Sequence, residues 1–209
     1  MKKIVIAGPD GCGKTTLIRT LAMEIESRGH SVTLNSPWDG MRLQKTFTSK
    51  SAIMDYLQQL PDLSRLLFIL HGLILSLEQA LEQKSDYLLI DSYWYKFFLV
   101  ESKIQNSVSL RPYFNHLPEP DKVYFLRTPL SVITARKQSH SYYECGGAVP
   151  SRKNFSDFQN SLHQAWERFV TAQHSWSVLC GLNNPDRICQ IIMSEENLPQ
   201  KGVQAHGTK

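Results

Sequence analysis

The chain opens with an apolar run, a glycine-rich turn and an amphipathic segment, and this succession constrains its fold more than any other feature. Residues 4–7, Ile-Val-Ile-Ala, form a short buried strand by pattern. From Lys14 to Arg28 apolar residues recur at helical spacing, and Gly29 follows where a helix commonly ends. A buried strand that turns directly into a helix predicts one unit of a parallel α/β sheet.

The turn between these segments matches the Walker A phosphate-binding pattern. Gly11 and Gly13 allow successive backbone N–H groups to point at one anion, and the helix adds its positive end. Lys14 is expected to reach the β and γ phosphates, and Thr15 to offer its hydroxyl to Mg²⁺. The loop therefore predicts that the chain binds ATP with Mg²⁺. The residues expected to contact the nucleotide are Gly8, Asp10, Gly11, Cys12, Gly13, Lys14, Thr15 and Thr16.

The four cysteines, at positions 12, 145, 180 and 189, lie far apart and form no Cys-x-x-Cys pair. This spacing specifies neither a zinc site nor a disulfide framework, so we expect reduced thiols. Cys12 lies in the phosphate loop near Lys14 and a helix N-terminus, where a thiolate would be stabilised. We interpret Cys12 first as a small residue that fills the loop, and expect its alkylation to block ATP binding.

Four further apolar runs predict the remaining strands, at residues 31–35, 87–90, 123–126 and 177–180. Helical patterns separate them and cover residues 41–84 apart from Pro61, about 130–137, and 185 to about 193. Strands that alternate with helices in this way predict an α/β fold with a five-stranded parallel sheet and helices on both faces. Its ligand should lie at the carboxyl ends of the strands.

Two stretches do not fit as regular elements. Residues 138–150 are polar, aromatic and glycine-bearing, and are too long for an idle connection, so the segment at about 137–156 is a candidate lid. Residues 194–209 have almost no apolar content, which predicts a disordered tail. We therefore expect one domain, residues 1–193, followed by that tail.

Composition narrows the class of protein. Of 209 residues, 42% are hydrophobic and 20% charged, which suits one globular domain with a buried core. The net charge of +4 is mild and its cations are dispersed, which favours a small anionic ligand over nucleic acid. The longest apolar run, residues 66–77, is shorter than a membrane span. With no signal-peptide pattern, we expect a cytoplasmic protein that binds neither nucleic acid nor membrane.

Many folds carry this phosphate loop, so the rest of the chain must distinguish a kinase from a GTPase or a motor. The sequence has no Asn-Lys-x-Asp stretch that would read guanine. One small domain also leaves no room for the arms of a motor ATPase. A small-molecule kinase is the class that these observations favour.

Several motifs occur in an order that resembles the thymidylate kinases, and nucleoside monophosphate kinases more broadly, over about residues 2–193. They are the phosphate loop with Asp10, Leu66-Leu67-Phe68, Asp91-Ser92-Tyr93, Pro120-Asp121 with the strand to Leu126, Ala135-Arg136, and the stretch from Ser151 to Gln159. The resemblance implies a three-layer P-loop kinase fold with a lid, ATP as donor and Mg²⁺ as cofactor. It also implies a homodimer through helices beside the acceptor site.

The resemblance implies catalytic roles as well. Asp91, at the end of a buried strand, would hold Mg²⁺ or its waters. Because Gly11 brings no charge to the loop, the migrating phosphoryl group needs cations from elsewhere, and Arg136, Arg152 and Lys153 are the candidates. The catalytic residues that we assign are Lys14, Asp91, Arg136 and Arg152, and the metal ligands are Thr15 and Asp91.

On the acceptor side, Asp10 would accept a hydrogen bond from a sugar hydroxyl. Phe68 would stack on the acceptor base, although an aromatic in an apolar helix also suits a core. Tyr93 and its aromatic neighbours Trp38, Trp94 and Tyr95 would shape a flat pocket or fill the core. The sequence leaves both alternatives open.

The sequence departs from the family at three positions, where Asn35, Gly72 and Ser92 stand in place of arginines. Each lost charge-assisted contact to a phosphate is worth roughly 1.5 to 3 kcal/mol, so the loss is substantial. Either other cations substitute, or the acceptor is not thymidine monophosphate. The candidate substitutes are Arg42, Lys45 and Lys96.

The function that we expect is transfer of the γ-phosphoryl group of ATP to a nucleotide, a deoxynucleoside monophosphate or a modified one. A first alternative is a kinase of a nucleoside or another hydroxylated metabolite, for which no acceptor phosphate needs to be gripped. A second is a nucleotide-binding regulatory protein that has lost acceptor chemistry. Transfer itself would require mainly positioning and charge neutralisation.

Overall fold

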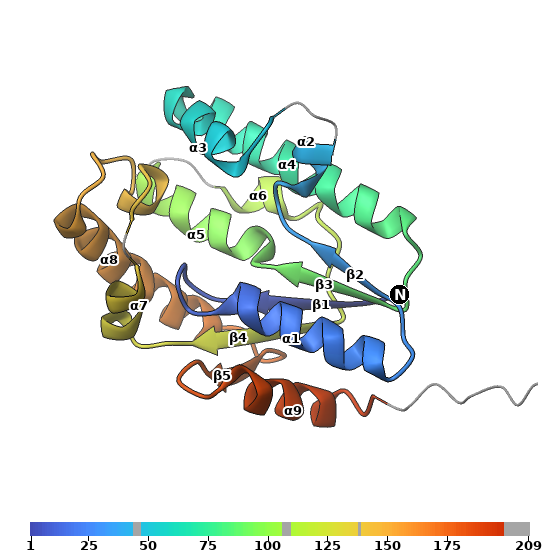
Figure 1. The fold of residues 1–209 in the computed structure, drawn as a ribbon. Coiled ribbons are helices and arrows are strands. Elements are labelled where there is room, and N and C mark those ends of the chain that lie inside the picture. The colour runs from blue at the N-terminus through green and yellow to red at the C-terminus, as the bar shows by residue number, and fades with distance from the viewer. Residues whose placement is uncertain (44–46, 106–109, 138, 199–209) are drawn as a thin grey trace, which may run out of the picture.

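A five-stranded parallel sheet forms the centre of the molecule, as the sequence predicts (Figure 1). The computed structural model describes residues 1–43, 47–105, 110–137 and 139–198. The strands lie in the order β2-β3-β1-β4-β5. Because β1 lies in the middle, the loop that follows it is flanked by the carboxyl ends of other strands on both sides. The strands are β1 (Lys2–Ala7), β2 (Val32–Asn35), β3 (Tyr87–Asp91), β4 (Lys122–Arg127) and β5 (Ser177–Cys180).

Alternation along the strands produces two separate cores, one on each face of the sheet. In β1, Ile4 and Ile6 point to one face, and Val5 and Ala7 to the other. Helices α1 (Lys14–Ser27) and α9 (Pro185–Glu195) cover the first face. Helices α4 (Asp62–Glu82), α5 (Tyr93–Ile104) and α8 (Arg152–Thr171) cover the second. The result is the three-layer arrangement that buries a parallel sheet on both sides.

Shorter elements surround the carboxyl end of the sheet. They are α2 (Asp39–Leu43), α3 (Lys50–Gln59), α6 (Arg111–Phe114), α7 (Leu130–Arg136) and the 3₁₀ helix η1 (Tyr143–Cys145). The side-chain hydroxyl of Ser49 accepts a hydrogen bond from the backbone N–H of Ala52, which caps α3 at its start. Ser151 caps α8 in the same way, through Asn154 N–H.

Helix α4 is long and apolar enough, by length and composition, to cross a membrane, and half of its apolar stretch is buried inside the protein. Its buried face includes Arg65, whose guanidinium lies 3.1 Å from the fully buried carboxylate of Glu101 on α5. Arg65 also contacts Asp62, and Gln105 donates a hydrogen bond to Glu101. A buried ion pair with these partners fixes α4 to α5, so we interpret α4 as a core helix.

The amino edge of the sheet is closed by polar contacts between neighbouring segments. The backbone N–H of Lys3 donates to Asp121, at 2.7 Å. Ser31 donates to the carboxylate of Asp86 through both its N–H and its hydroxyl, each at 2.9 Å. Glu196 pairs with Lys2 and accepts a hydrogen bond from Tyr124. The sheet is thus tied together at the edge opposite the glycine loop.

Three segments differ from the sequence-based boundaries. Helix α9 continues to Glu195, and Leu198 is buried with its carbonyl accepting a hydrogen bond from Arg28, so packing extends past residue 193. Residues 199–209 lie outside the described part. The segment that we expect to be a lid contains η1. Gly146 ends η1 at φ 67° and packs against the ring of Phe158. Helices α5 and α6 were not among the predicted elements.

Candidate active site

The glycine loop depends on glycine at the positions where the backbone turns. Gly8 has φ 150°, and a Cβ built there would lie 2.8 Å from the sulfur of Cys12. Gly13 has φ 106°, in the left-handed region, and is the residue that precedes α1. This path places the N-terminus of α1 directly beneath the loop, where its positive end favours an anion.

The Lys14 side chain lies across the loop and is almost fully buried. Its Nζ donates to the carbonyl oxygens of Gly8 and Pro9, at 3.0 and 2.8 Å. Burial by itself lowers the pKa of Lys14, but the sulfur of Cys12 and the carboxylates of Asp91 and Asp10 outweigh it, so the net pKa is raised. Lys14 therefore keeps its positive charge beside the loop.

Two side-chain hydroxyls contact the carboxylate of Asp91 at the end of β3. The Thr15 hydroxyl donates to Asp91 Oδ2 at 3.1 Å, and the Ser92 hydroxyl donates to Asp91 Oδ1 at 2.9 Å. Ser92 and Tyr93 both have positive φ, 69° and 45°, which is costly for residues other than glycine and is often associated with functional sites. Hard oxygen donors of this kind fit Mg²⁺.

The described residues contain no group of three His, Cys, Asp or Glu side chains that would hold a metal ion by themselves. A magnesium ion that arrives with a nucleotide usually keeps several waters and takes only one or two protein ligands. The Thr15 and Asp91 pair is of that size.

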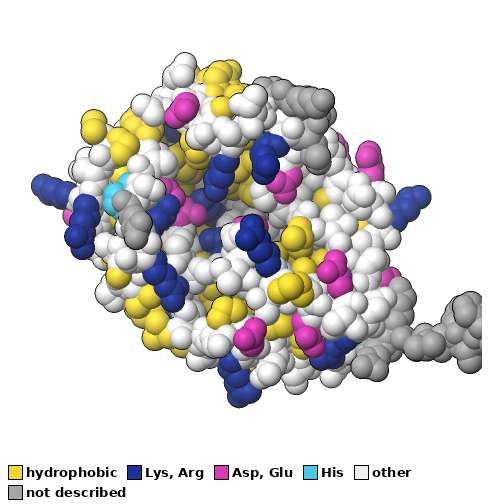
Figure 2. All heavy atoms as spheres, in the orientation of Figure 1, with side chains coloured by type: hydrophobic (Ala, Val, Ile, Leu, Met, Phe, Trp, Pro, Cys, Tyr) yellow, Lys and Arg dark blue, Asp and Glu magenta, His cyan; other side chains and the backbone are white. Residues whose placement is uncertain are grey.

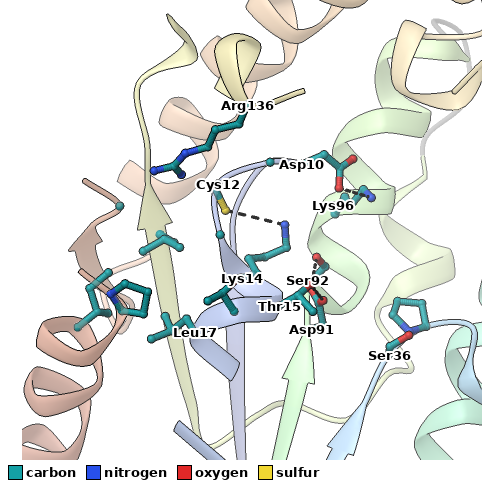
Figure 3. A pocket seen from close by; sticks show the side chains of 18 of the residues that line it. Asp10, Cys12, Lys14, Thr15, Leu17, Ser36, Asp91, Ser92, Lys96 and Arg136 are labelled. Atoms are coloured by element: carbon teal, nitrogen blue, oxygen red, sulfur yellow. Dashed lines mark hydrogen bonds and ion pairs between the residues drawn. The ribbon is translucent and has the colours of Figure 1, made fainter. Parts of the chain in front are cut away.

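A cavity of about 480 Å³ opens over the loop and extends in both directions from it (Figures 2 and 3). Figure 2 shows the molecule hollowed here, with Lys and Arg side chains gathered around the opening. On the β4–β5 side the wall includes Arg136, Gly181 and Asn183. On the β3–β2 side it includes Ser92 and the loop Ser36–Trp38. One cavity therefore connects the two halves of the sheet across the glycine loop.

Two lysines line the β3–β2 half of this cavity. Lys96, on α5, donates to Asp10 Oδ1 at 2.8 Å (Figure 3). Burial raises the pKa of Asp10, but the charges of Lys96 and Lys14 outweigh it and hold that pKa well below its ordinary value. Lys50, at the start of α3, lies on the same wall. Partial loss of water and the nearby charge of Lys96 lower the pKa of Lys50.

Of the three positions that lack the family arginines, Ser92 contacts Asp91, and the other two, Asn35 and Gly72, have packing roles. Asn35 is buried, and its side-chain amide donates to the carbonyl of Ser76 on α4 at 2.8 Å. A Cβ built at Gly72 would lie 3.1 Å from Met41 and 3.2 Å from Trp38, so a larger side chain requires these neighbours to shift. Asn35 therefore ties the loop after β2 to α4, and Gly72 leaves room for Trp38.

The structure brings together only some of the predicted site residues. Arg136 ends α7 and extends over the glycine loop, with its guanidinium 4.0 Å from a Cβ built at Gly13 (Figure 3). Arg152 is exposed at the start of α8 and, like Lys153, does not line the cavity. A phosphate contact from Arg152 stays a prediction.

The remaining acceptor candidates lie away from the cavity wall. Phe68 packs against Phe47 and Tyr56, with ring centroids 5.7 and 5.0 Å away. Tyr93 is buried and donates its hydroxyl to the carbonyl of Pro118. Arg42 is exposed and faces Asp39 at 3.7 Å. Packing explains where Phe68 and Tyr93 lie. Direct contact of Phe68, Tyr93 or Arg42 with an acceptor stays a prediction. Lys45 lies outside the described residues.

The buried position of Cys12 supports its interpretation as a filling residue. Its side chain is 1% exposed, and burial raises the pKa of the thiol despite the charge of Lys14. Its carbonyl accepts a hydrogen bond from Thr128, which joins the glycine loop to the end of β4. The expected block of ATP binding by alkylation stays untested.

Sequence reasoning did not single out Lys50, Gly181 or Asn183. Lys50 follows the α3 cap, but no sequence signal says that this helix end meets α5. Gly181 follows β5, and a Cβ there would lie 1.9 Å from the hydroxyl of Thr128, so a glycine after the fifth strand was a usable signal. Asn183 lies in the same turn.

The fold is the α/β fold of P-loop kinases, with five parallel strands and helices on both faces. No family model and no curated protein matches the sequence. Among the solved structures that match is a deoxyadenosine kinase from M. mycoides with bound dATP. The match has a TM-score of 0.58 and 15% identity, and covers 93% of this chain and 99% of that one. At this identity the likeness concerns the fold.

Proposed function

We propose that this protein is an ATP-dependent phosphotransferase that acts on a small molecule, most specifically a (deoxy)nucleoside monophosphate. The observation that carries the proposal is that Lys14, the Thr15–Asp91 pair and the Asp10–Lys96 pair all line one cavity. The first two are what a triphosphate with Mg²⁺ requires. The third lies where a second substrate would meet the triphosphate.

The position of the Thr15–Asp91 pair orients the two substrates. Mg²⁺ held by Thr15 and Asp91 would neutralise charge on the reacting end of the triphosphate, so the γ phosphate belongs beside this pair, on the β3 side of the loop. The rest of the ATP then extends toward Arg136 and the turn at Gly181. The acceptor is left with the β3–β2 half of the cavity, between α3 and α5.

Each of this chain's residues contributes charge or position rather than covalent chemistry. Backbone N–H groups of the loop and Lys14 hold the phosphates, and Arg136 adds a cation over the glycine loop from the β4–β5 side. Mg²⁺, bound by Thr15 and Asp91, would neutralise charge on the β and γ oxygens. Arg152 remains the second proposed cation.

Two carboxylates, Asp10 and Asp91, line the cavity, and their contacts favour a phosphate acceptor over a hydroxyl acceptor. Transfer to a hydroxyl is helped by a base that takes its proton, and an effective base has a pKa near the working pH. Lys96 and Lys14 hold the pKa of Asp10 far below that, and Asp91 is engaged by Thr15 and Ser92. A monophosphate is already anionic and needs no deprotonation. These contacts favour a nucleotide acceptor.

One observation favours a second candidate. One of the matching solved structures bears the name of a deoxyadenosine kinase, and a nucleoside has no phosphate to be gripped by the missing arginines. A nucleoside kinase is therefore the alternative. A nucleotide-binding regulatory protein is the third possibility.

A coupled assay of ADP release separates these candidates. It compares each deoxynucleoside 5′-monophosphate with its matched nucleoside, with Lys14→Ala as the control for contaminating activity. We expect turnover with at least one monophosphate. Turnover with nucleosides alone would replace this proposal by the second candidate, and ATP binding without acceptor-stimulated turnover would favour a regulatory role.

A homodimer and a cytoplasmic location stay proposals. Four exposed apolar side chains follow one another along the outer surface of α4, namely Leu63, Leu67, Ile74 and Leu81. Light scattering at several protein concentrations measures whether the chain pairs.

A further inference from the structure

The acceptor half of the active-site cavity continues into a second cavity of about 390 Å³. The two cavities share four wall residues, Trp38, Lys50, Lys96 and Phe97. The second one is bounded by α3, by α5 and by residues 139–144, which belong to the predicted lid. Any molecule that reaches from the glycine loop into this space passes the wall that holds Lys50 and Lys96.

The lysines around this junction differ in whether they have an ion-pair partner among the described residues. Lys96 is paired with Asp10, and Lys137, deeper in the second cavity, is paired with Glu144. Lys50 forms no ion pair with any described residue, although Asp55 lines the same cavity. Burial first, and the charge of Lys96 second, lower the pKa of Lys50. An anion placed between Lys50 and Lys96 would relieve this repulsion. A dianionic phosphate provides more of that relief than a neutral hydroxyl.

The walls beyond the lysines are suited to a flat, apolar body. They include the indole of Trp38, the ring of Phe97, the thioether of Met54 and the ring of Tyr143. Trp38 is held edge-on against Phe97, with ring centroids 5.4 Å apart. Aromatic walls with a charged group at one end are typical of sites for aromatic phosphate esters.

The other side of Trp38 is closed. Trp38 and Met41 pack onto Gly72, and Phe68 contacts other aromatic residues and does not line the cavity. The surface where the family resemblance places the acceptor base is thus part of the core in this chain. The second cavity is the open space that adjoins the lysines.

We propose that Lys50 and Lys96 together hold the phosphate of a phosphomonoester acceptor, and that the rest of the acceptor enters the second cavity between α3, α5 and residues 139–144. This inference rests on the proposed phosphotransferase function and names its substrate class. It assigns the phosphate-binding role of the missing arginines to Lys96 and to Lys50, at the start of α3. No sequence pattern indicated Lys50.

The first experiment measures the lysine site without any catalysis. Methyl phosphate is titrated into the protein with Mg²⁺ and a non-hydrolysable ATP analogue in excess, so that the glycine loop is filled. We expect Lys50→Met and Lys96→Met each to weaken methyl phosphate binding by about 10- to 100-fold, the scale of one lost charge-assisted contact. Lys103→Met, on the same helix as Lys96 but outside both cavities, should bind within about twofold of wild type.

Two results would overturn this part of the proposal. One is methyl phosphate binding that Lys50→Met leaves unchanged. The other is no detectable methyl phosphate binding by the wild-type protein with the loop filled. Because neither readout depends on turnover, the lysine site is tested even if the protein proves not to be a kinase.

The second experiment tests where the body of the acceptor lies. Met54→Trp adds bulk to the second cavity, and Gln58→Trp adds the same bulk on the exposed side of α3. With the most active monophosphate of the panel, Met54→Trp should raise KM at least tenfold while methyl phosphate binding and the melting temperature stay near those of Gln58→Trp. An unchanged KM in a folded Met54→Trp protein would exclude the second cavity. Failure of every acceptor in the panel would instead contradict the proposed function.

Discussion

The two halves of the cavity are built in different ways. On the donor half, the glycine loop and Lys14 come from one continuous stretch, residues 8–16, between β1 and α1, and Arg136 is the proposed addition from another element. On the acceptor half, Lys50, Lys96 and Trp38 come from three separate segments that meet only through tertiary packing. A local site of the first kind has a readable sequence signature, whereas a site assembled from distant segments can change its residues while the fold is kept.

The largest effect is expected on the donor half. Lys14→Ala should reduce ATP-dependent turnover about 10³-fold or more, because the variant lacks the cation beside the β and γ phosphates. Steady-state kinetics measure the loss. Circular dichroism and the melting temperature provide the control, since Lys14 also donates to two loop carbonyls. A folded Lys14→Ala protein with normal turnover would remove the loop from catalysis.

A buried ion pair, Arg65 with Glu101, fixes α4 to α5, the helix that carries Lys96. Arg65→Met leaves the fully buried Glu101 carboxylate without its main partner, which should cost about 3–5 kcal/mol of the free energy of unfolding. Urea denaturation measures the change. Arg127→Met, which breaks an exposed pair with Glu167, is the matched control and should cost at most about 1 kcal/mol. Equal losses in the two variants would contradict the special role of the buried pair.

A comparison of two arginines tests whether the donor half is complete as described. Arg136→Ala should lower kcat about 10²-fold, since its guanidinium lies over the glycine loop. The sequence predicts a similar loss for Arg152→Ala. An Arg152→Ala loss of that size would mean that the start of α8 approaches the phosphates during turnover. A change under about threefold would leave the role to Arg136.

Much of the fold was predictable from sequence because it follows from local patterns. Buried strands appear as short apolar runs, and β5 was placed at residues 177–180, as observed. The phosphate loop was predictable because glycine, lysine and threonine act there through the backbone path of one turn. The parallel sheet followed from the alternation of strands and helices.

The acceptor half was not predictable for physical reasons. Phe68 and Lys50 are both on helices, and only the packing of α3 and α4 determines that Lys50 faces the cavity while Phe68 contacts Phe47. Nothing in the spacing of α5 indicates that Lys96 reaches Asp10. A resemblance could transfer the positions of the arginines, but not the residues that stand in for them.

The packing of Trp38 on Gly72 predicts a smaller change in the free energy of unfolding, which tests how the wall of the acceptor half is built. In an unconstrained helix, Gly→Ala would stabilise by up to about 1 kcal/mol. Gly72→Ala should instead destabilise by roughly 1–3 kcal/mol, because the added methyl meets Met41 and the carbonyl of Pro37. Urea denaturation measures it, with His71→Ala as an exposed control in the same helix. Stabilisation would show that this side of Trp38 has room for a larger residue.

The smallest expected effect concerns the Asp10–Lys96 pair. Since the pKa of Asp10 is held below its ordinary value of 3.8, the ionised carboxylate stabilises the fold above that pH, and the contribution is lost as the pH falls below it. The melting temperature of Asp10→Asn should therefore lie below that of wild type at neutral pH, and the gap should narrow in acid. A gap that is the same at every pH would contradict the ion pair.

The polar contacts at the amino edge of the sheet have a mechanical consequence. Lys3 with Asp121, Ser31 with Asp86 and Glu196 with Lys2 tie adjacent segments at the edge farthest from the cavity (Figure 1). At the carboxyl edge, Thr15 contacts Asp91 and Thr128 contacts the carbonyl of Cys12, and these contacts join the glycine loop to the ends of β3 and β4. The sheet is thus held at its amino edge and again beneath the glycine loop, so the ligand site rests on strands that both cores keep in place.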